Sequence, residues 1–213
     1  RLVRRMIEEE TAATLPAVAY HDADWYAAER HAVFAAEWQL AGFRTHLRRP
    51  GDFVTHDLAG WSVVVVVDGD GDLRAFHNVC RHRGARLCDG HKGSVGNIVC
   101  PYHQWTYDLT GKLIHTEHMG DGFDRSQYSL KQVHLANVAG LLFVCLADQP
   151  PADIEDMRRE MEPYIAPHRI ADCKVAFAED LIENGNWKLT MENNRECYHC
   201  KANHPELTIS LYE

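Results

Sequence analysis

The sequence lacks a long hydrophobic run, a hydrophobic leader and an excess of positive charge. Its apolar stretches, such as Val63–Val67 and 140–146, have the length of strands and fall well short of the roughly 18 apolar residues that a membrane-spanning helix needs. The basic residues 1–5 lead into Glu8–Glu10 instead of the apolar segment of a signal peptide. Acidic residues (31) outnumber lysines and arginines (22), and the net charge of -9 argues against nucleic acid or an anionic membrane as a partner.

The sequence has too few cysteines, and an odd number of them, for a disulfide framework. The chain has seven cysteines, an odd number, and at least two of them lie in metal-ligand motifs. This usage predicts a reducing compartment, and we expect a cytoplasmic protein. The rest of the composition, 46% hydrophobic and 25% charged, is typical of a globular protein, and a length of 213 residues fits one or two domains.

Two short motifs carry most of the chemical information. Cys80 and His82 form a C-x-H motif, and Cys100 and His103 form a C-x2-H motif further along the chain. A Rieske [2Fe–2S] cluster takes two thiolates on one iron and two histidines on the other, and the two motifs supply that set. The same four residues also suit a structural zinc site, but zinc fingers tend to pair their cysteines in one motif and their histidines in another. We therefore expect a Rieske cluster, with structural zinc as the alternative.

The residues around these motifs indicate the type of cluster. High-potential Rieske centres usually brace their two loops with a disulfide. Here Cys88 lies in the first loop, and no cysteine stands opposite it in the second. We expect no disulfide, a buried and inert Cys88, and a lower-potential centre of the kind that feeds electrons to an oxygenase.

A second group of metal-binding residue types lies near the end of the sequence. Residues 186–199 are predicted to be helical, and Glu196 and His199 share one face of that helix. Pro205 disfavours helical geometry at the preceding residue, so we expect the helix to end between His199 and His204. Two imidazoles and one carboxylate on one face are the ligands of mononuclear non-haem Fe(II) oxygenases.

Two other interpretations of this segment stay open. Two histidines on a glutamate-rich helix can simply be surface residues. Cys197 and Cys200 form a C-x-x-C motif, which occurs in dithiol redox proteins and in zinc half-sites, although no second such motif is present.

The pattern along the chain changes twice. Residues 20–40 have helical spacing, and Gly42 is expected to end that helix. Strands are predicted from there to Pro150, and helical spacing returns with Ile154, Met157 and Met161. Alternating residues at 175–182 predict a strand that enters a new sheet. The other expected strands cover 61–67, 73–76, 106–108, 112–114 and 140–146.

Taken together, the cluster motifs and the C-terminal helix resemble the α subunits of Rieske non-haem iron oxygenases over nearly the whole chain. Segments 76–84, 186–189 and 192–200 look most like the quaternary-ammonium branch, which includes the glycine betaine, stachydrine, carnitine and choline monooxygenases. Glu196 leans the same way, because most ring-hydroxylating dioxygenases have an aspartate at that position.

The resemblance implies an α+β fold. An N-terminal helical segment (1–43) would pack on the catalytic domain, followed by an all-β Rieske domain (44–150) and the first part of a helix-grip catalytic domain (151–213). It also implies an Fe(II) held by His199 and His204, with a third ligand, an aspartate, beyond residue 213. We therefore expect the sequence to be part of a substantially longer protein.

The resemblance further implies a mechanism. Electrons from NAD(P)H would pass through a separate flavin-containing reductase to the [2Fe–2S] cluster and then to the mononuclear iron. In a homotrimer, Glu196 would join a cluster histidine of one subunit to His199 of the next, as carboxylates do for metal-bound imidazoles. The expected reaction is hydroxylation of an N-methyl group of a quaternary ammonium compound, with release of formaldehyde.

Two alternatives to this function remain. An aromatic ring-hydroxylating dioxygenase belongs to the same enzyme class. A Rieske ferredoxin, a pure electron carrier, belongs to a different one, but a carrier needs neither the helical residues 20–40 nor the chain after residue 150.

Overall fold

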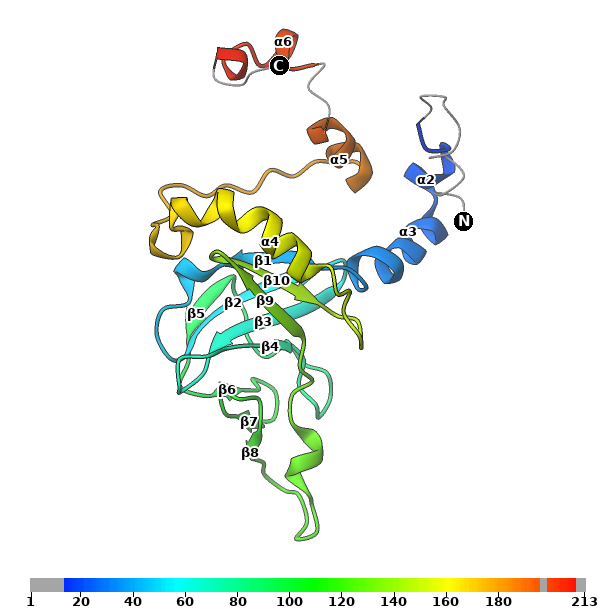
Figure 1. Cartoon of the computed structure of the whole chain (residues 1–213). Coiled ribbons are helices and arrows are strands. Elements are labelled where there is room, and N and C mark those ends of the chain that lie inside the picture. Colours follow the sequence, from blue (N-terminus) through cyan, green and yellow to red (C-terminus); the bar gives the residue numbers. More distant parts are fainter. Residues whose placement is uncertain (1–13, 196–198, 210–213) are drawn as a thin grey trace. The chain divides into compact units, whose positions relative to one another are not determined.

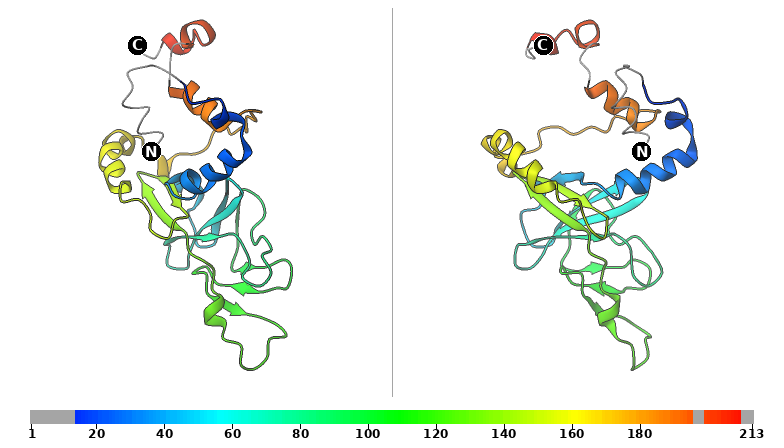
Figure 2. Two further views of the ribbon diagram at one scale, coloured as in Figure 1. Left: turned by 90° about the vertical axis from the view of Figure 1, so that its right-hand side faces the viewer. Right: turned by 45° about the vertical axis from the view of Figure 1, so that its right-hand side comes forward.

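A computed structural model describes residues 14–195 and 199–209 (Figure 1). These residues belong to two compact units: Glu29–Phe177, and a second unit made from the described parts of 1–28 and 178–213. The larger unit contains three antiparallel sheets and helix α4, and Figure 2 shows these sheets in two further views. The second unit is helical. This combination confirms the predicted α+β class.

Strand β3 lies at the centre of the larger unit. Its five consecutive valines, 63–67, are fully buried, and successive side chains point to opposite faces of the sheet. The even-numbered valines pack in one core with Phe76 and Trp105, and the odd-numbered ones pack in another with Leu47 and Leu142. The sheet order is β4-β3-β2-β5, with strands β2 (Asp52–Leu58), β3 (Trp61–Val67), β4 (Leu73–His77) and β5 (Lys92–Ser94).

The second sheet closes the odd-valine core and carries helix α4. Its order is β1-β10-β9, and both pairings are antiparallel. Ile154 and Met157 of α4 pack on Ala136 and Val138 of β9, so the predicted helical stripe is confirmed at these two positions. In Figure 1, α4 (yellow) runs over this sheet. The elements are β1 (Gln39–Phe43), β9 (His134–Val138), β10 (Leu141–Cys145) and α4 (Ile154–Ile165).

A third, small sheet extends the even-valine core into a separate lobe. Ile98, Tyr107 and Leu113 from its three strands are buried in that core. The loop with the first cluster motif connects β4 to β5, and the loop with the second connects β6 to β7. Cys80 and Cys100 from these loops are buried in the same core. The strands are β6 (Ile98–Val99), β7 (Thr106–Tyr107) and β8 (Leu113–His115).

The turn between β3 and β4 is organised by one buried carboxylate. Asp68 is fully buried and accepts hydrogen bonds from the backbone N–H groups of Asp70 (3.0 Å) and Asp72 (2.9 Å). The Nε–H of Arg74 donates to its second oxygen at 2.8 Å. These bonds satisfy a charge that would otherwise be costly to bury, and they fix the register of the β3–β4 hairpin.

The second unit joins residues that are far apart in the sequence. The Tyr20 hydroxyl donates to Oε1 of Glu192 at 2.6 Å, and the Asn186 side-chain amide donates to the Tyr20 carbonyl oxygen at 3.1 Å. Buried Lys188 places its ammonium over the Tyr20 ring. The helices are α2 (Val18–His21), α3 (Ala23–Glu29), which continues across the unit boundary, α5 (Trp187–Arg195) and α6 (Cys200–Asn203).

The shorter helical turns complete the secondary structure. A π-helix follows α3 directly, and the others are single 3-10 turns. They are Arg30–Phe34 (π), Arg44–His46, Arg125–Tyr128, Ala166–His168, Ile170–Asp172 and Leu207–Ile209.

Two sequence predictions of secondary structure are wrong. The helix expected over 20–40 ends at Phe34, and Gly42 lies inside strand β1 instead of ending a helix. Pairing with β10, in which Gln39 faces Val144, overrides the helical spacing there. The strand expected at 175–182 does not form among the described residues, and Phe177 and Leu181 are 78% and 83% exposed.

The helix expected over 186–199 is present as α5 up to Arg195, and the segment 200–203 forms the separate helix α6. Trp187 and Met191 lie at helical spacing and predict a buried stripe on this helix, but Met191 is 48% exposed. The compact unit 29–177 is larger than the domain expected at 44–150, because it includes β1 and α4. The boundaries at 43 and 150 stay sequence predictions.

Candidate functional site

The two cluster motifs form two loops that are closed by the same pattern of backbone hydrogen bonds. In the first, the Cys80 N–H donates to the Ala85 carbonyl (2.8 Å), and the Gly84 N–H donates back to the Cys80 carbonyl (3.0 Å). In the second, Cys100 N–H bonds to the Trp105 carbonyl at 2.8 Å and Gln104 N–H to the Cys100 carbonyl at 3.1 Å. The residue four after each cysteine has positive φ, +72° at Gly84 and +58° at Gln104. A glycine fills this left-handed position at little cost in the first loop.

The equivalent loops bring the four predicted ligands together as two pairs. Cys80 and Cys100 are both buried, and their side chains lie within hydrogen-bonding distance of each other. The imidazole rings of His82 and His103 lie with their centroids 4.7 Å apart. Each pair therefore takes one residue type from each loop.

This pairing suits a binuclear centre better than a single ion. No three histidine, cysteine, aspartate or glutamate side chains within 14–195 and 199–209 converge as one group that could hold a metal ion. A structural zinc would need all four ligands around one point, whereas a [2Fe–2S] cluster needs a thiolate pair on one iron and an imidazole pair on the other. The donor set and its division into pairs fit the Rieske cluster.

His82 has a ring nitrogen that is available as a metal ligand. Its Nδ1 is buried and makes no hydrogen bond to any described residue. Burial, the neighbouring His103 and Arg83 lower the pKa of His82, so its imidazole is neutral, as a metal ligand must be. An orphaned nitrogen is costly in a protein interior, and iron coordination would satisfy it.

The sulfur atoms lie among donors that stabilise negative charge. The Tyr107 hydroxyl is 3.4 Å from Cys80 Sγ and also accepts the Arg81 N–H at 3.0 Å. The backbone N–H groups of Tyr102 and His103 donate to the Cys100 sulfur. Burial and the nearby Cys80 nevertheless raise the pKa of Cys100, so the Cys100 thiol depends on a bound metal to hold it as a thiolate.

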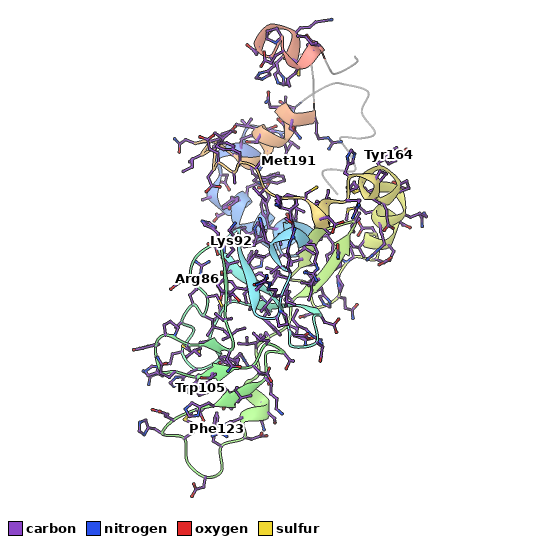
Figure 3. All side chains as sticks on the ribbon, turned by 90° about the vertical axis from the view of Figure 1, so that its left-hand side faces the viewer. Arg86, Lys92, Trp105, Phe123, Tyr164 and Met191 are labelled. Carbon is purple, nitrogen blue, oxygen red and sulfur yellow. The ribbon has the colours of Figure 1, made fainter. Side chains whose placement is uncertain are left out.

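Trp105 and Tyr107 are site residues that the sequence analysis missed. Trp105 is 2% exposed, and its indole stacks on His82 at a centroid distance of 4.7 Å and an interplanar angle of 8°. Phe123 and Tyr128 pack edge-on against the same indole, and Figure 3 labels Trp105 and Phe123 in this lobe. The available signal was their position directly after the C-x2-H motif, at the start of a strand.

Cys88 matches its prediction as a buried small residue. It is 5% exposed, and burial, followed by the charge of Asp89, raises the pKa of its thiol to about 11. Asn78 holds its backbone on both sides, accepting its N–H and donating to its carbonyl, each at 2.8 Å. The six cysteines among the described residues are all free thiols, as expected for loops without a bracing disulfide.

The two histidines of the second predicted site lie close together. The ring centroids of His199 and His204 are 5.5 Å apart. His199 caps the N-terminus of α6, and His204 ends it by donating its N–H to the Cys200 carbonyl at 2.8 Å. The bend before Pro205 therefore turns the two imidazoles toward each other, and such a pair can supply two ligands to one iron.

The carboxylate predicted beside this pair, Glu196, lies outside the described residues. On α5, Glu192 accepts a hydrogen bond from the Tyr20 hydroxyl, and this bond, with burial and the carboxylate charge, raises the pKa of Tyr20. A third protein ligand for the histidine pair is not among the described residues.

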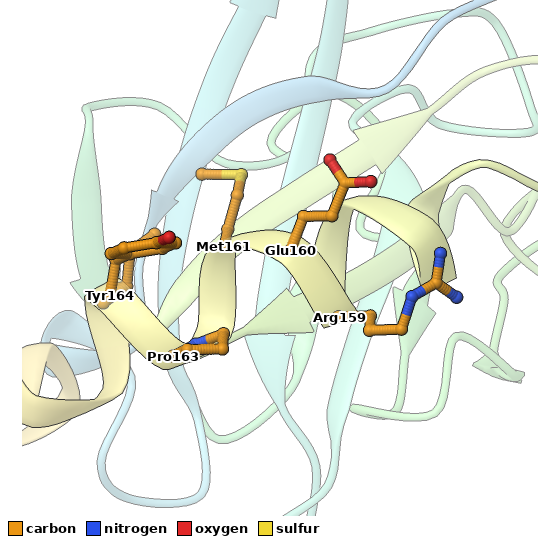
Figure 4. Close-up of a pocket in the computed structure, with 6 residues that line it drawn as sticks. Arg159, Glu160, Met161, Pro163 and Tyr164 are labelled. Atoms are coloured by element: carbon orange, nitrogen blue, oxygen red, sulfur yellow. The ribbon is translucent and has the colours of Figure 1, made fainter.

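The hollow along helix α4 holds none of the predicted ligands. This hollow has a volume of about 690 Å³ (Figure 4), and its walls are Arg159, Glu160, Met161, Pro163, Tyr164 and Ile165. None of the helices in the described ranges combines the length and the apolar character that crossing a lipid bilayer requires.

The two candidate metal sites lie in segments that match two different protein families. Residues 37–135 match the Rieske [2Fe-2S] domain, and residues 157–212 match the catalytic domain of ring-hydroxylating α subunits. The first match contains all four residues of the two pairs, and the second contains His199 and His204.

Individual relatives point to one branch. The chain is 45% identical over 201 residues to the glycine betaine monooxygenase oxygenase subunit of Chromohalobacter salexigens, covering 94% of this chain and 45% of the relative. It is 33% identical to the carnitine monooxygenase oxygenase subunit of Acinetobacter baumannii, covering 95% and 55%. The chain thus spans about half the length of the curated relatives it matches.

A solved structure agrees with these relatives. A quaternary ammonium Rieske monooxygenase, described in connection with carnitine oxidation and inter-subunit electron transfer, matches with a TM-score of 0.84 and 30% identity. The match covers 92% of this chain and 54% of that one.

Proposed function

Because this chain belongs to the Rieske non-haem iron oxygenase α subunits, we propose that the complete protein hydroxylates an N-methyl group of a quaternary ammonium compound. The observation that carries the proposal is the 45% identity to a glycine betaine monooxygenase oxygenase subunit over 201 residues, 94% of this chain. The relatives named for carnitine support the same substrate class.

The reaction balances as a monooxygenation. One atom of O2 enters the N–CH3 group and the other leaves as water. NAD(P)H supplies two electrons and one proton, and the second proton comes from solvent. The N-hydroxymethyl product then breaks its C–N bond and gives formaldehyde, a tertiary amine and a proton. Iron supplies the O2 activation that side chains cannot perform.

The chain's own residues hold and connect the metals. Cys80 and Cys100 would bind one iron of the cluster, and His82 and His103 the other. The partly exposed imidazoles would be the side from which electrons leave, because both thiols are buried. His199 and His204 would bind the mononuclear iron from the two ends of α6.

Glu196 would connect the two metal centres across subunits. In the homotrimer that we propose, it would accept hydrogen bonds from a cluster histidine of one subunit and from His199 of the next. A carboxylate in that place holds both imidazoles in orientation and raises their basicity as ligands. Electrons would come from a separate flavin-containing reductase. A reducing, cytoplasmic setting suits the thiolate ligands.

One experiment separates this function from aromatic dihydroxylation, which the family match over 157–212 also allows. The complete protein, loaded with iron, is reduced chemically, mixed with glycine betaine or with naphthalene, and exposed to O2 for a single turnover. The proposal predicts formaldehyde and dimethylglycine from glycine betaine. A cis-dihydrodiol from naphthalene without formaldehyde from any quaternary amine would reject it.

A further inference from the structure

A pocket reaches the cluster ligands from the cysteine side. It has a volume of about 270 Å³ and is lined by His77, Val79, Cys80, Arg81 and Lys131. Its walls come from the end of β4, from the first cluster loop and from the segment before β9. The end of β4 and the segment before β9 are tied together where the His77 N–H donates to the Lys131 carbonyl at 3.0 Å. Neither His82 nor His103 lines this pocket.

The charge of the pocket is opposite to that of the protein. Its lining has two permanent cations, Arg81 and Lys131, and no carboxylate, although the chain carries a net charge of -9. Within the described ranges neither cation forms an ion pair. The Nε–H of Arg81 is buried and donates to no described residue.

The rim of the pocket has the mixed character of a weak protein interface. Val79 is 40% exposed at its edge, beside exposed Lys131. A small apolar contact surrounded by charge is typical of transient electron-transfer complexes, which bury less surface than stable complexes. Cations in an otherwise acidic protein steer an acidic partner to that one place.

We propose that this pocket is the docking site of an acidic iron–sulfur electron-transfer protein or domain, which delivers electrons to the cluster beside Cys80. The inference rests on the proposed function and adds the place where electrons enter. One electron leaves the reduced cluster of the donor and enters the oxidised Rieske cluster; no bond is formed and no proton moves. Entry at the thiolate side leaves the histidine side free for transfer out.

The test uses reduced plant-type ferredoxin, an acidic protein whose potential lies below that of Rieske centres, so that transfer is downhill. Stopped-flow absorbance measures the second-order rate of cluster reduction in the complete holoenzyme at low ionic strength. Lys131→Glu should lower this rate about tenfold or more, because steering by opposite charge is worth that much. Raising the salt concentration should shrink the difference in rate between wild type and variant. At 0.1 M ionic strength, charges more than about 10 Å apart are largely screened from each other.

A matched control carries the same change of charge elsewhere in the same unit. Arg159 lies on α4 and does not line the pocket, and among the described residues it forms an exposed ion pair with Asp156. Arg159→Glu is therefore the control. The cluster of this variant should be reduced by ferredoxin at a rate within twofold of wild type. Reduced riboflavin, a small reductant that needs no docking surface, should reduce all three proteins at similar rates. Equal ferredoxin rates for Lys131→Glu and Arg159→Glu would overturn the proposal. Dissociation of the oligomer by Lys131→Glu alone would also overturn it, since the pocket would then be a subunit interface.

The same measurement distinguishes this proposal from the proposed function. Formation of the cluster and single-turnover formaldehyde release after chemical reduction do not depend on Lys131. A Lys131→Glu protein that turns over normally when chemically reduced, but accepts electrons slowly from ferredoxin, supports both.

Discussion

The imidazole of His82 lies parallel to the indole of Trp105, with ring centroids 4.7 Å apart. The same tryptophan accepts the Cys100 N–H through its carbonyl. Trp105 therefore touches a residue of each cluster loop, one through its ring and one through its backbone.

Replacement of Trp105 should loosen the cluster loops as well as the core. Trp105→Ala should lower the free energy of unfolding by about 3–5 kcal/mol, as for other buried tryptophans. Trp105→Phe keeps an aromatic face against His82 and should cost less and retain the cluster. Urea denaturation and the visible spectrum check both effects. Equal stability and equal cluster content in the two variants would contradict the stacking role.

Removal of the Tyr107 hydroxyl should lower the cluster potential. The hydroxyl lies 3.4 Å from Cys80 Sγ, and a hydrogen bond to a ligating sulfur stabilises the more negative, reduced cluster. If the bond is stronger to the reduced form by about 1.4 kcal/mol, Tyr107→Phe shifts the potential down by about 60 mV. Spectroelectrochemical titration measures the shift. An unchanged potential with an intact cluster would exclude this hydrogen bond.

Asp68 should make the hairpin sensitive to acid. Burial opposes ionisation, but the Arg74 bond and the N–H groups of Asp72 and Asp70 prevail, so the pKa of Asp68 lies below its usual 3.8. A carboxyl whose folded pKa is depressed stabilises the protein fully above the unfolded pKa, and the stabilisation is lost as pH falls through the folded value. Asp68→Asn should therefore cost about 1.5–3 kcal/mol at pH 7.

The difference between wild type and Asp68→Asn should shrink below pH 4, because the wild-type carboxyl is then being protonated. Thermal unfolding across pH 3–7 gives the comparison. A difference that stays constant over this range would show that the carboxylate charge contributes nothing.

Glu196 should control communication between the metals. Glu196→Gln should keep both metals but slow cluster reoxidation in a single turnover, because an amide cannot carry the bridging charge. Glu196→Asp is shorter by about 1.5 Å, and misplacement near 1 Å can cost on the order of a hundredfold. Glu192→Gln on α5 is the matched control, because it makes the same change of side chain four residues earlier in the sequence. The cluster of this variant should be reoxidised at the wild-type rate. Wild-type reoxidation in Glu196→Gln would reject the bridge.

The sequence was sufficient for the parts that local chemistry determines. The valines of β3, the hairpin turn at Asp68 and the ligand pairs each have a short-range pattern with a physical cause. Strand β1 could not be foreseen, because its pairing with β10 joins Gln39 to Val144 across most of the larger unit. The spacing of residues along the chain does not predict a pairing between strands so far apart in sequence.

Some residues of the candidate site could likewise be predicted from the sequence, and others could not. The metal ligands are recognisable as residue types, but Trp105 and Tyr107 act through a stacking angle and a hydroxyl distance, which only the fold supplies. The pocket beside Cys80 combines Arg81 with Lys131, which the sequence separates by an entire lobe. At 175–182 the alternating pattern predicted a strand, yet Phe177 and Leu181 have no strand partner among the described residues.

Mössbauer spectroscopy of the complete protein, grown on ⁵⁷Fe, tests the central claim that one chain holds two separate iron centres. Wild type should show the paired irons of a [2Fe–2S] cluster together with a distinct high-spin Fe(II). His199→Ala and His204→Ala should each lose the Fe(II) signal and keep the cluster signal, whereas His82→Ala should lose the cluster. A high-spin Fe(II) signal that survives both His199→Ala and His204→Ala would contradict the account.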